Sequence, residues 1–405
     1  MFYNSIDKRA DSGNISSFMR AFIFAAFFLP LGPVEFSSQY ASFLKVCQFA
    51  ALVLISIVVL RSVKNGSCSF SREFVAASLF FGSFLVITIF VQGGITEGFK
   101  NLFAWPLLSL YTAIELKSNP RQTLGCLSAL LSLVMLLDLG VTPLLYGEVY
   151  HLRFLGHVQV IFQLAILNFS ATLLLVYLEG RLLPVRLFSI VVTIVDCFLT
   201  DAASARVAVL FFVLFLSSET CRIKDRNNQK SYSVFSIADS RFLLITALSI
   251  NLIIIFLSVS RSDFLGLEWG FNARNFIWEK ALGYFSNSPL FGYGAQGVMF
   301  DMFWGASGNY AHSQLMQELV DGGIVLTFFF YNMLYTFARK SNSIKDDKIR
   351  SVVRYAFFSY MLLMILDAVN LYCYFYIFLP FMVSFKDLKR TNVNNSDGLN
   401  LEVKR

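Results

Sequence analysis

The sequence has few charged residues. Only 15% of its 405 residues are Asp, Glu, Lys or Arg, whereas a soluble domain normally carries about a quarter. Apolar residues make up 56% of the chain, which contains 45 phenylalanines and has a mean hydropathy of +0.63. Apolar runs of about twenty residues, the length that crosses a bilayer as an α-helix, recur along the whole chain. The composition therefore predicts an all-α, polytopic membrane protein.

Cysteine is scarce, and a cleavage site for a signal peptidase is missing. The six cysteines lie in apolar runs or in segments predicted to be cytoplasmic, and none lies in the long polar segment 261–321. A disulfide framework is therefore not expected. The first apolar segment runs into Pro30 and Pro33 without a small-residue cleavage site, so it is predicted to stay as a membrane anchor.

Several common catalytic signatures are also missing. The sequence contains no metal-ligand spacing, no Walker-type or dinucleotide-binding glycine loop, no serine-nucleophile elbow, and no Asp-x-Asp pair that would hold a metal for a nucleotide sugar. Neither a metal nor a cofactor is therefore expected.

The apolar runs predict about twelve transmembrane helices and one long outer loop with short helices. The predicted spans are 17–33, 41–60, 74–92, 101–116, 122–145, 157–178, 184–200, 203–218, 242–260, 322–338, 352–369 and 370–385. The predicted organisation is a cytoplasmic N-terminus (1–16), helices 1–9 (17–260), an outer catalytic loop (261–321), helices 10–12 (322–385) and a cytoplasmic tail (386–405).

The distribution of basic residues predicts the orientation. Cytoplasmic segments of membrane proteins are enriched in Lys and Arg. With both termini in the cytoplasm, 26 of the 33 basic residues fall on the inner side of the predicted map. The net charge of +7 is then explained by topology, and no nucleic-acid partner is needed.

Three arginines remain at outer membrane edges, where basic residues are otherwise depleted: Arg153, Arg206 and Arg261. The planar guanidinium group binds a bidentate anion such as a pyrophosphate at the level of the lipid headgroups. The alternative is that each arginine reaches the lipid phosphates or pairs locally, as Arg206 can with Asp201.

The outer loop holds the candidate catalytic residue. Gly292 and Gly294 follow Pro289 and predict turns at which the backbone can approach a ligand closely. Ala311–Val320 is predicted to be helical, with Gly322-Gly323 as its stop and His312 in its first turn. The alternative for His312 is a packed helix residue without a catalytic role.

Three aspartates, Asp138, Asp196 and Asp367, lie inside predicted spans. Ionisable residues at such positions are functional candidates, because a charge in the membrane is costly. They are scattered along the sequence, and no pair of them predicts a proton relay.

Four stretches resemble the O-antigen ligase/polymerase superfamily of bacterial membrane proteins, and with the span count they cover most of the chain. One departure is Ala203, where members often carry Ser or Gly. The stretches are Arg153-Phe154-Leu155-Gly156, Ser204-Ala205-Arg206, Arg274 with Trp278 leading to Asn287–Gly294, and His312-Ser313 followed by Gly323.

The resemblance implies a metal-independent glycosyltransferase in the bacterial cytoplasmic (inner) membrane. Its expected partners are membrane lipid, a polyprenyl-diphosphate-linked oligosaccharide as donor and a chain-length regulator protein. The implied site comprises His312 as catalytic residue, Arg153, Arg206, Arg261 and Arg274 as diphosphate ligands, and Trp278, Gly292, Gly294 and Gly323 as residues that position the loop.

A polymerase of polysaccharide repeat units is the first expectation. A ligase that transfers the glycan to the lipid A core would share all of these motifs. A secondary transporter is the alternative from another class, but the two halves of the sequence show neither an internal repeat nor matching helix-breaking Gly/Pro pairs.

The segregation of basic residues predicts which loops a reagent can reach. A cysteine introduced at Ser307 is expected to react with a membrane-impermeant thiol reagent on cells whose outer membrane has been permeabilised. One introduced at Ser231 is expected to stay unreactive. The opposite labelling pattern would overturn the predicted topology.

Overall fold

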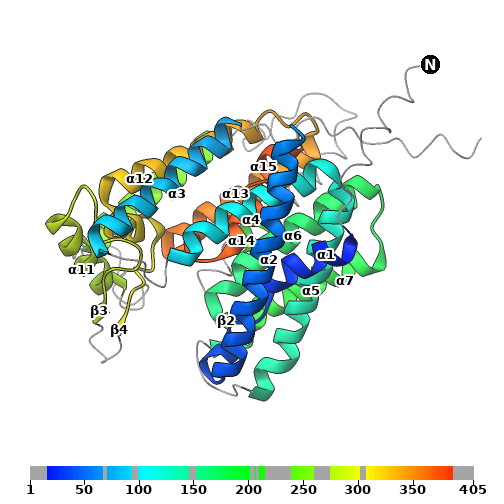
Figure 1. The fold of residues 1–405 in the computed structure, drawn as a ribbon, viewed down its shortest axis with the longest axis horizontal. Helices are drawn as coiled ribbons and strands as arrows, with labels where there is room; N and C mark the ends of the chain where they lie inside the picture. Colours follow the sequence, from blue (N-terminus) through cyan, green and yellow to red (C-terminus); the bar gives the residue numbers. More distant parts are fainter. Residues whose placement is uncertain are drawn as a thin grey trace, which may run out of the picture.

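The computed structural model describes residues 16–66, 71–93, 99–145, 152–200, 206, 209–214, 239–259, 274–301 and 307–385. These residues are mostly helical (Figure 1). The longer helices are α1 (Ser17–Phe28), α2 (Ser38–Lys64), α3 (Arg72–Gln92), α4 (Phe99–Ser118), α5 (Pro120–Leu145), α6 (Val158–Glu179), α7 (Pro184–Leu199), α10 (Ser240–Val259), α11 (Arg274–Asn287), α12 (Gln314–Ser341) and α13 (Asp347–Leu366).

Short elements connect or extend these helices. Antiparallel hairpins pair β1 with β2 and β3 with β4. The short elements are η2 (Gly32–Glu35), η4 (Val369–Leu371), α14 (Cys373–Phe378), α15 (Phe381–Ser384), β1 (Leu152–Arg153), β2 (Gly156–His157), β3 (Phe300–Asp301) and β4 (Ser307–Gly308).

The helices are those of a membrane-embedded protein. In the described part of the chain, α2, α3, α5, α6 and α12 are long and apolar enough to cross a membrane. Three shorter apolar stretches lie in α1, in α10 and across α14 and α15. The prediction of an all-α membrane protein is therefore confirmed, whereas the number of twelve spans and their orientation stay predictions.

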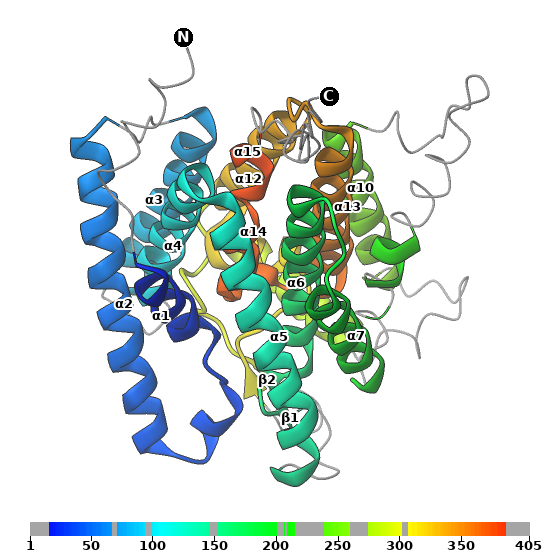
Figure 2. The same cartoon turned by 90° about the vertical axis from the view of Figure 1, so that its right-hand side faces the viewer.

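Helix α6 lies at the centre of the bundle, and α2 and α7 lie at its edge (Figure 2). The protein itself buries 83% of the most apolar stretch of α6, but only 28% of the corresponding stretch of α2. Helix α2 exposes Phe49 and Leu60, and α7 exposes Phe198. Large apolar surfaces of this kind are unfavourable in water and fit a lipid environment.

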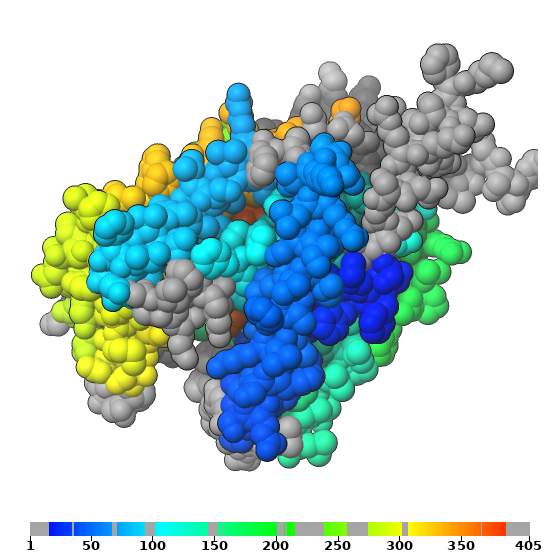
Figure 3. Space-filling view, in the orientation of Figure 1, coloured from blue at the N-terminus to red at the C-terminus, as the bar shows by residue number. Residues whose placement is uncertain are grey.

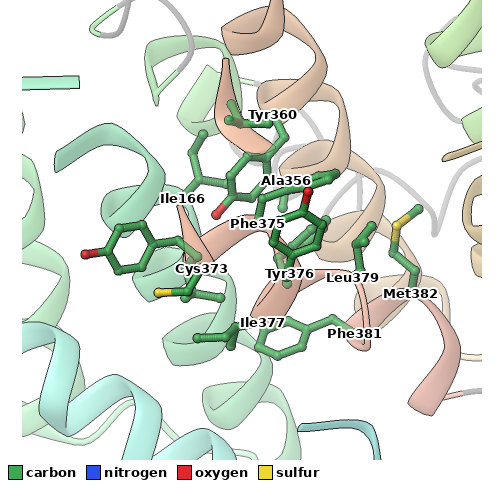
Figure 4. Packing of buried hydrophobic residues seen from close by; sticks show 14 of the residues in the cluster. Ile166, Ala356, Tyr360, Cys373, Phe375, Tyr376, Ile377, Leu379, Phe381 and Met382 are labelled. Atoms are coloured by element: carbon green, nitrogen blue, oxygen red, sulfur yellow. The ribbon is translucent and has the colours of Figure 1, made fainter. Parts of the chain in front are cut away.

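The C-terminal helices enter the core beside α6. Figure 4 shows Ile166 of α6, Ala356 of α13 and Phe375 of α14 packed together. The Tyr360 ring lies 5.3 Å from that of Phe375, and its hydroxyl donates to the backbone oxygen of Gln163 at 2.8 Å. The predicted span 370–385 is thus two short helices, and the break between them falls at Pro380, which has no N–H to continue a helix.

Buried hydroxyl and amide groups join α5, α6 and α7. Asn168 donates to Thr193 at 2.8 Å, and the hydroxyls of Ser132 and Ser189 lie 2.6 Å apart. All four residues are at most 8% exposed. An apolar helix gains little by exchanging contacts with lipid for contacts with another apolar helix. Hydrogen bonds between helices therefore help to hold α7 in the bundle.

Helix α12 begins at Gln314 and not at the predicted Ala311, and it runs to Ser341. The predicted stop at Gly322-Gly323 coincides with a kink: Gly323 has a φ of 62° and a non-helical backbone, which separates two helical segments within α12. The kink lies next to the predicted boundary between outer loop and membrane helix at residues 321 and 322, and that boundary stays a prediction.

The kink is held by the segment that follows α11. The N–H of Ile324 donates to the carbonyl oxygen of Pro289 at 2.9 Å, and the N–H of Val325 donates to that of Leu290 at 3.3 Å. These carbonyls replace the helical acceptors that the kink removes. A Cβ atom at position 323 would collide with the Leu290 carbonyl group and lie 2.6 Å from the Pro289 oxygen.

Gly323→Ala is expected to destabilise the protein. The substitution forces an L-residue into the left-handed region, which costs roughly 1–3 kcal/mol, and adds the collision with Leu290. The measurement is the thermal unfolding midpoint in detergent. Gly283→Ala in α11 is the control, since a Cβ there meets no atom within 4 Å; equal midpoints for the two variants would contradict the described lock.

Candidate functional site

The segment after α11 lies against the first half of α12. Tyr293 N–H donates to the Val320 oxygen at 2.9 Å, and Gly294 N–H donates to the Asp321 oxygen at 2.7 Å. Gly292 and Gly294 both have positive φ values, of 59° and 80°. A Cβ at Gly292 would collide with the Val320 carbonyl oxygen, so this close approach requires glycine. The two predicted turn glycines therefore let the backbone of this segment lie directly against the backbone of α12.

Helix α3 holds the same segment from the other side. The side-chain amide of Gln92 donates to the backbone oxygens of Tyr293 at 3.1 Å and Ala295 at 3.0 Å. The N–H of Ala295 donates to the Thr88 hydroxyl at 3.0 Å. The segment is thus fixed between α3 and α12, both of which are candidate membrane spans.

His312 lies just outside α12. It was predicted in the first turn of a helix, but it precedes the helix N-cap, Ser313, and has a φ of 51°. This left-handed conformation is uncommon for a residue other than glycine. The half-buried imidazole lies 4.5 Å from the Tyr310 ring, centroid to centroid. Sequence periodicity could not predict the turn that places His312 here.

Trp278 and Arg274 of α11 approach this turn. The fully buried indole of Trp278 donates from Nε1 to the backbone oxygen of Ala311 at 3.0 Å. Arg274, one turn earlier, interacts electrostatically with Asp367. Burial lowers the pKa of the Arg274 guanidinium from its usual value, and the Asp367 carboxylate opposes this change.

Asp367 and Tyr310 meet at the end of α13. The N–H of Ala368 lies 2.8 Å from the Tyr310 hydroxyl oxygen and 2.9 Å from Asp367 Oδ1, both of which accept from it. Asp367, predicted as an intramembrane functional candidate, thus lies in the same set of contacts as Arg274 and His312. Three segments that are distant in sequence, around residues 274–278, 310–312 and 367–370, form one site.

A buried cluster of carboxylate and amide side chains lies next to this site. Glu318 accepts from the side-chain amides of Gln314 and Asn370, each at 2.7 Å. The Gln317 amide lies 3.1 Å from both oxygens of Asp321. These residues were not predicted as site residues. The spacing of 314, 317, 318 and 321, which puts four polar side chains on one face of an apolar helix, is the signal that could have identified them.

A small cavity borders this cluster. Its volume is about 30 Å³, and Asp321 and Asn370 line it together with aromatic residues of α3, α4 and α14. Figure 3 shows the surface hollowed between α2 and α3, with atoms of α4 in the floor of the hollow. The cavity is large enough for a water molecule or a small polar group.

Arg153 and Arg206 form a second cluster, at the start of α6. Arg153 pairs with Asp138 at 2.6 Å and with Asp196 at 2.7 Å, and it also donates to the Thr200 hydroxyl. Arg206 donates from Nε and Nη2 to the backbone oxygen of Thr200, at 3.0 and 2.6 Å. Thr200 therefore links the two arginines.

The two aspartates, which are far apart in the sequence, meet in the structure, because α5 and α7 lie side by side and bring both carboxylates to one guanidinium. With two carboxylates on one guanidinium, the buried group carries a formal charge of −1 when both are ionised. Arg153 thus has strong partners within the protein, and its predicted contact with a diphosphate stays a prediction.

The remaining predicted residues are only partly placed. Arg261 lies outside the described residues, as does Asp201, the predicted local partner of Arg206. Within the described ranges, no group of three His, Cys, Asp or Glu side chains lies close enough to hold a metal ion. The structure brings Arg274, Trp278, Gly292, Gly294, His312 and Gly323 into one assembly.

No protein-family model matches the chain, and no curated protein matches its sequence.

Arg153→Ala is expected to lower stability more than Arg206→Ala. Loss of Arg153 leaves two buried carboxylates without their cation, which costs about 3–5 kcal/mol. Loss of Arg206 removes the hydrogen bonds that one guanidinium makes to a single carbonyl oxygen, together worth roughly 1.5–3 kcal/mol. The thermal midpoint in detergent measures both. Arg153→Ala combined with Asp196→Asn should recover part of the loss, and no recovery would argue against the ion pair as its cause.

Proposed function

We propose that this protein is a polymerase of polysaccharide repeat units in the bacterial cytoplasmic membrane. It transfers a glycan from polyprenyl diphosphate to the next lipid-linked repeat unit on the outer face, and it spans the membrane about twelve times with both termini in the cytoplasm. The basis is the motif resemblance together with the geometry of the described site.

The observation that carries the proposal is the convergence of His312, Tyr310, Arg274 and Asp367 at one end of the helix bundle. A half-buried imidazole in the same group of contacts as a cationic side chain supports acid–base chemistry on a substrate that carries negative charge. The site adjoins helices that can cross a membrane, so a lipid-linked substrate can reach it while its lipid chain stays in the bilayer.

In the proposed reaction, neutral His312 accepts the proton from a hydroxyl group of the acceptor sugar. The acceptor oxygen forms a bond to the anomeric carbon of the donor glycan, and the bond between that carbon and the diphosphate oxygen breaks. Polyprenyl diphosphate leaves with both electrons of this bond. Arginine side chains stabilise the charge that develops on the departing diphosphate, the role that a metal ion has in other transferases.

Arg274 is the arginine of the described site that has this role. Asp367 attracts it electrostatically, and among the described residues the buried Nε of Arg274 has no hydrogen-bond partner. In this proposal a substrate oxygen accepts from it. Arg206 and Arg261 are the further ligands in this proposal, and Arg153 holds Thr200, to which Arg206 is bound.

A ligase would use the same residues, and only the acceptor distinguishes the two activities. A lipid-linked repeat unit as acceptor gives a ladder of polymer lengths, whereas the lipid A core as acceptor gives capped lipopolysaccharide. The test is therefore run with purified protein and a lipid-linked repeat unit as the sole substrate. Absence of a ladder in that assay would refute the polymerase.

His312→Gln is expected to abolish the polymer ladder at matched protein level. A general base contributes about 10²–10⁴-fold to the rate, and a glutamine cannot accept the proton. A near-normal ladder from His312→Gln would remove His312 from catalysis.

A further inference from the structure

Ala311, the residue before His312, is held at both of its peptide groups. Its N–H donates to Gln317 Oε1 at 2.8 Å, and its carbonyl oxygen accepts from Trp278 Nε1 at 3.0 Å. Both partner side chains are fully buried. The backbone that carries His312 is therefore fixed from α12 on one side and from α11 on the other.

Asp321 fixes the orientation of the Gln317 amide. The Nε2 group of Gln317 lies 3.1 Å from each carboxylate oxygen of Asp321 and 3.4 Å from the backbone oxygen of Asn309. Carboxylate and carbonyl oxygens only accept hydrogen bonds, so the NH₂ group must face them. The amide oxygen is then directed to the N–H of Ala311, which needs an acceptor.

The held segment has an unfavourable backbone conformation. His312 has a φ of 51°, in the left-handed region. Residues persist in such conformations only where the surrounding structure fixes them, and they are frequent at functional sites. The hydrogen bonds of Gln317 and Trp278 supply this restraint on the residue directly before His312.

We infer that Gln317 and Asp321 are positioning residues that hold the imidazole of His312 toward the acceptor hydroxyl. Gln317 acts through the backbone of Asn309 and Ala311, and Asp321 acts through Gln317. The inference rests on the proposed function for its catalytic consequence, but the restraint on His312 can be measured without any substrate.

The first measurement is the reactivity of His312. Diethyl pyrocarbonate acylates accessible imidazoles, and mass spectrometry of peptides separates His312 from the other two histidines, His151 and His157, which serve as internal references. Gln317→Met removes the amide while keeping the chain length, so His312 is expected to react several-fold faster relative to the references. An unchanged relative rate would overturn the inference.

The second measurement is the rate of polymer synthesis. A misplaced catalytic group can cost about a hundredfold in rate, so Gln317→Met should lower kcat by about that factor and leave KM for the acceptor nearly unchanged. Gln122→Met is the control for the chemical change itself, because Gln122 is an exposed residue whose amide oxygen accepts from Arg20 and which, among the described residues, has no bond to those of the site. Its kcat and its His312 reactivity should equal those of the unmodified protein.

A paired substitution tests the hydrogen-bond direction and remains informative where Gln317→Met fails to fold. Gln317→Glu alone sets two carboxylates against each other and should lower kcat as Gln317→Met does. Adding Asp321→Asn supplies an amide donor and leaves a carboxylate oxygen for the Ala311 N–H, so kcat and His312 reactivity should return at least in part. A double variant no better than Gln317→Glu would overturn the inference.

The outcomes separate this inference from the proposed function. An unmodified protein that makes no polymer, combined with faster His312 acylation in Gln317→Met, would refute the polymerase and support the restraint. An active protein in which Gln317→Met changes neither kcat nor His312 acylation would refute the restraint and leave the polymerase standing.

Discussion

The arrangement of the site depends on backbone hydrogen bonds at the kink of α12. Gly323 turns the helix out of its regular path, and the N–H groups that follow find acceptors in Pro289 and Leu290. Two residues earlier, the carbonyls of Val320 and Asp321 accept from the segment that contains Gly292 and Gly294. These hydrogen bonds satisfy the backbone groups of both segments. This matters in a membrane, because an unpaired backbone group finds no water there. It also sets where α11, and with it Arg274 and Trp278, lies against α12.

The polar side chains inside the bundle follow the same constraint. Two of them show this: Glu318 accepts from amides of its own helix α12 and of η4, and Asn168 donates to hydroxyls of α5 and α7. If one member is removed, its partners stay buried without a hydrogen bond, and the protein loses the free energy that was needed to remove them from water. A change at Asn370 therefore acts on α12 through Glu318, and the two ends of the site are energetically linked.

The sequence predicted the class of the fold because helix length and apolarity are local properties. Most predicted spans coincide with helices, and Gly292 and Gly294 were correctly placed at turns. Contacts between helices could not be predicted from the sequence. Nothing in the spacing of Asp138, Arg153 and Asp196 shows that α5 and α7 are neighbours. Gly323 illustrates the same limit: the glycine pair predicted the interruption of the helix, but not that the carbonyls of Pro289 and Leu290 would accept from the N–H groups after it. The roles predicted for His312 and the arginines remain proposals.

The shared guanidinium of Arg153 has a consequence for the assembly of the protein. The chain emerges from the ribosome with Asp138 in α5 first, then Arg153, and Asp196 in α7 last. A one-to-one pair of Asp138 and Arg153 is neutral, so α5 and α6 can enter the bilayer as a unit with their charges already matched. Helix α7 contributes a second carboxylate, Asp196, and the hydroxyls of Ser189 and Thr193. Their partners lie on α5, on α6 and at Arg153, so the surface that binds α7 forms only when these parts are together. The order of residues along the chain thus lets the neutral pair of Asp138 and Arg153 form before Asp196 adds the second carboxylate, whose charge the shared guanidinium then has to accommodate.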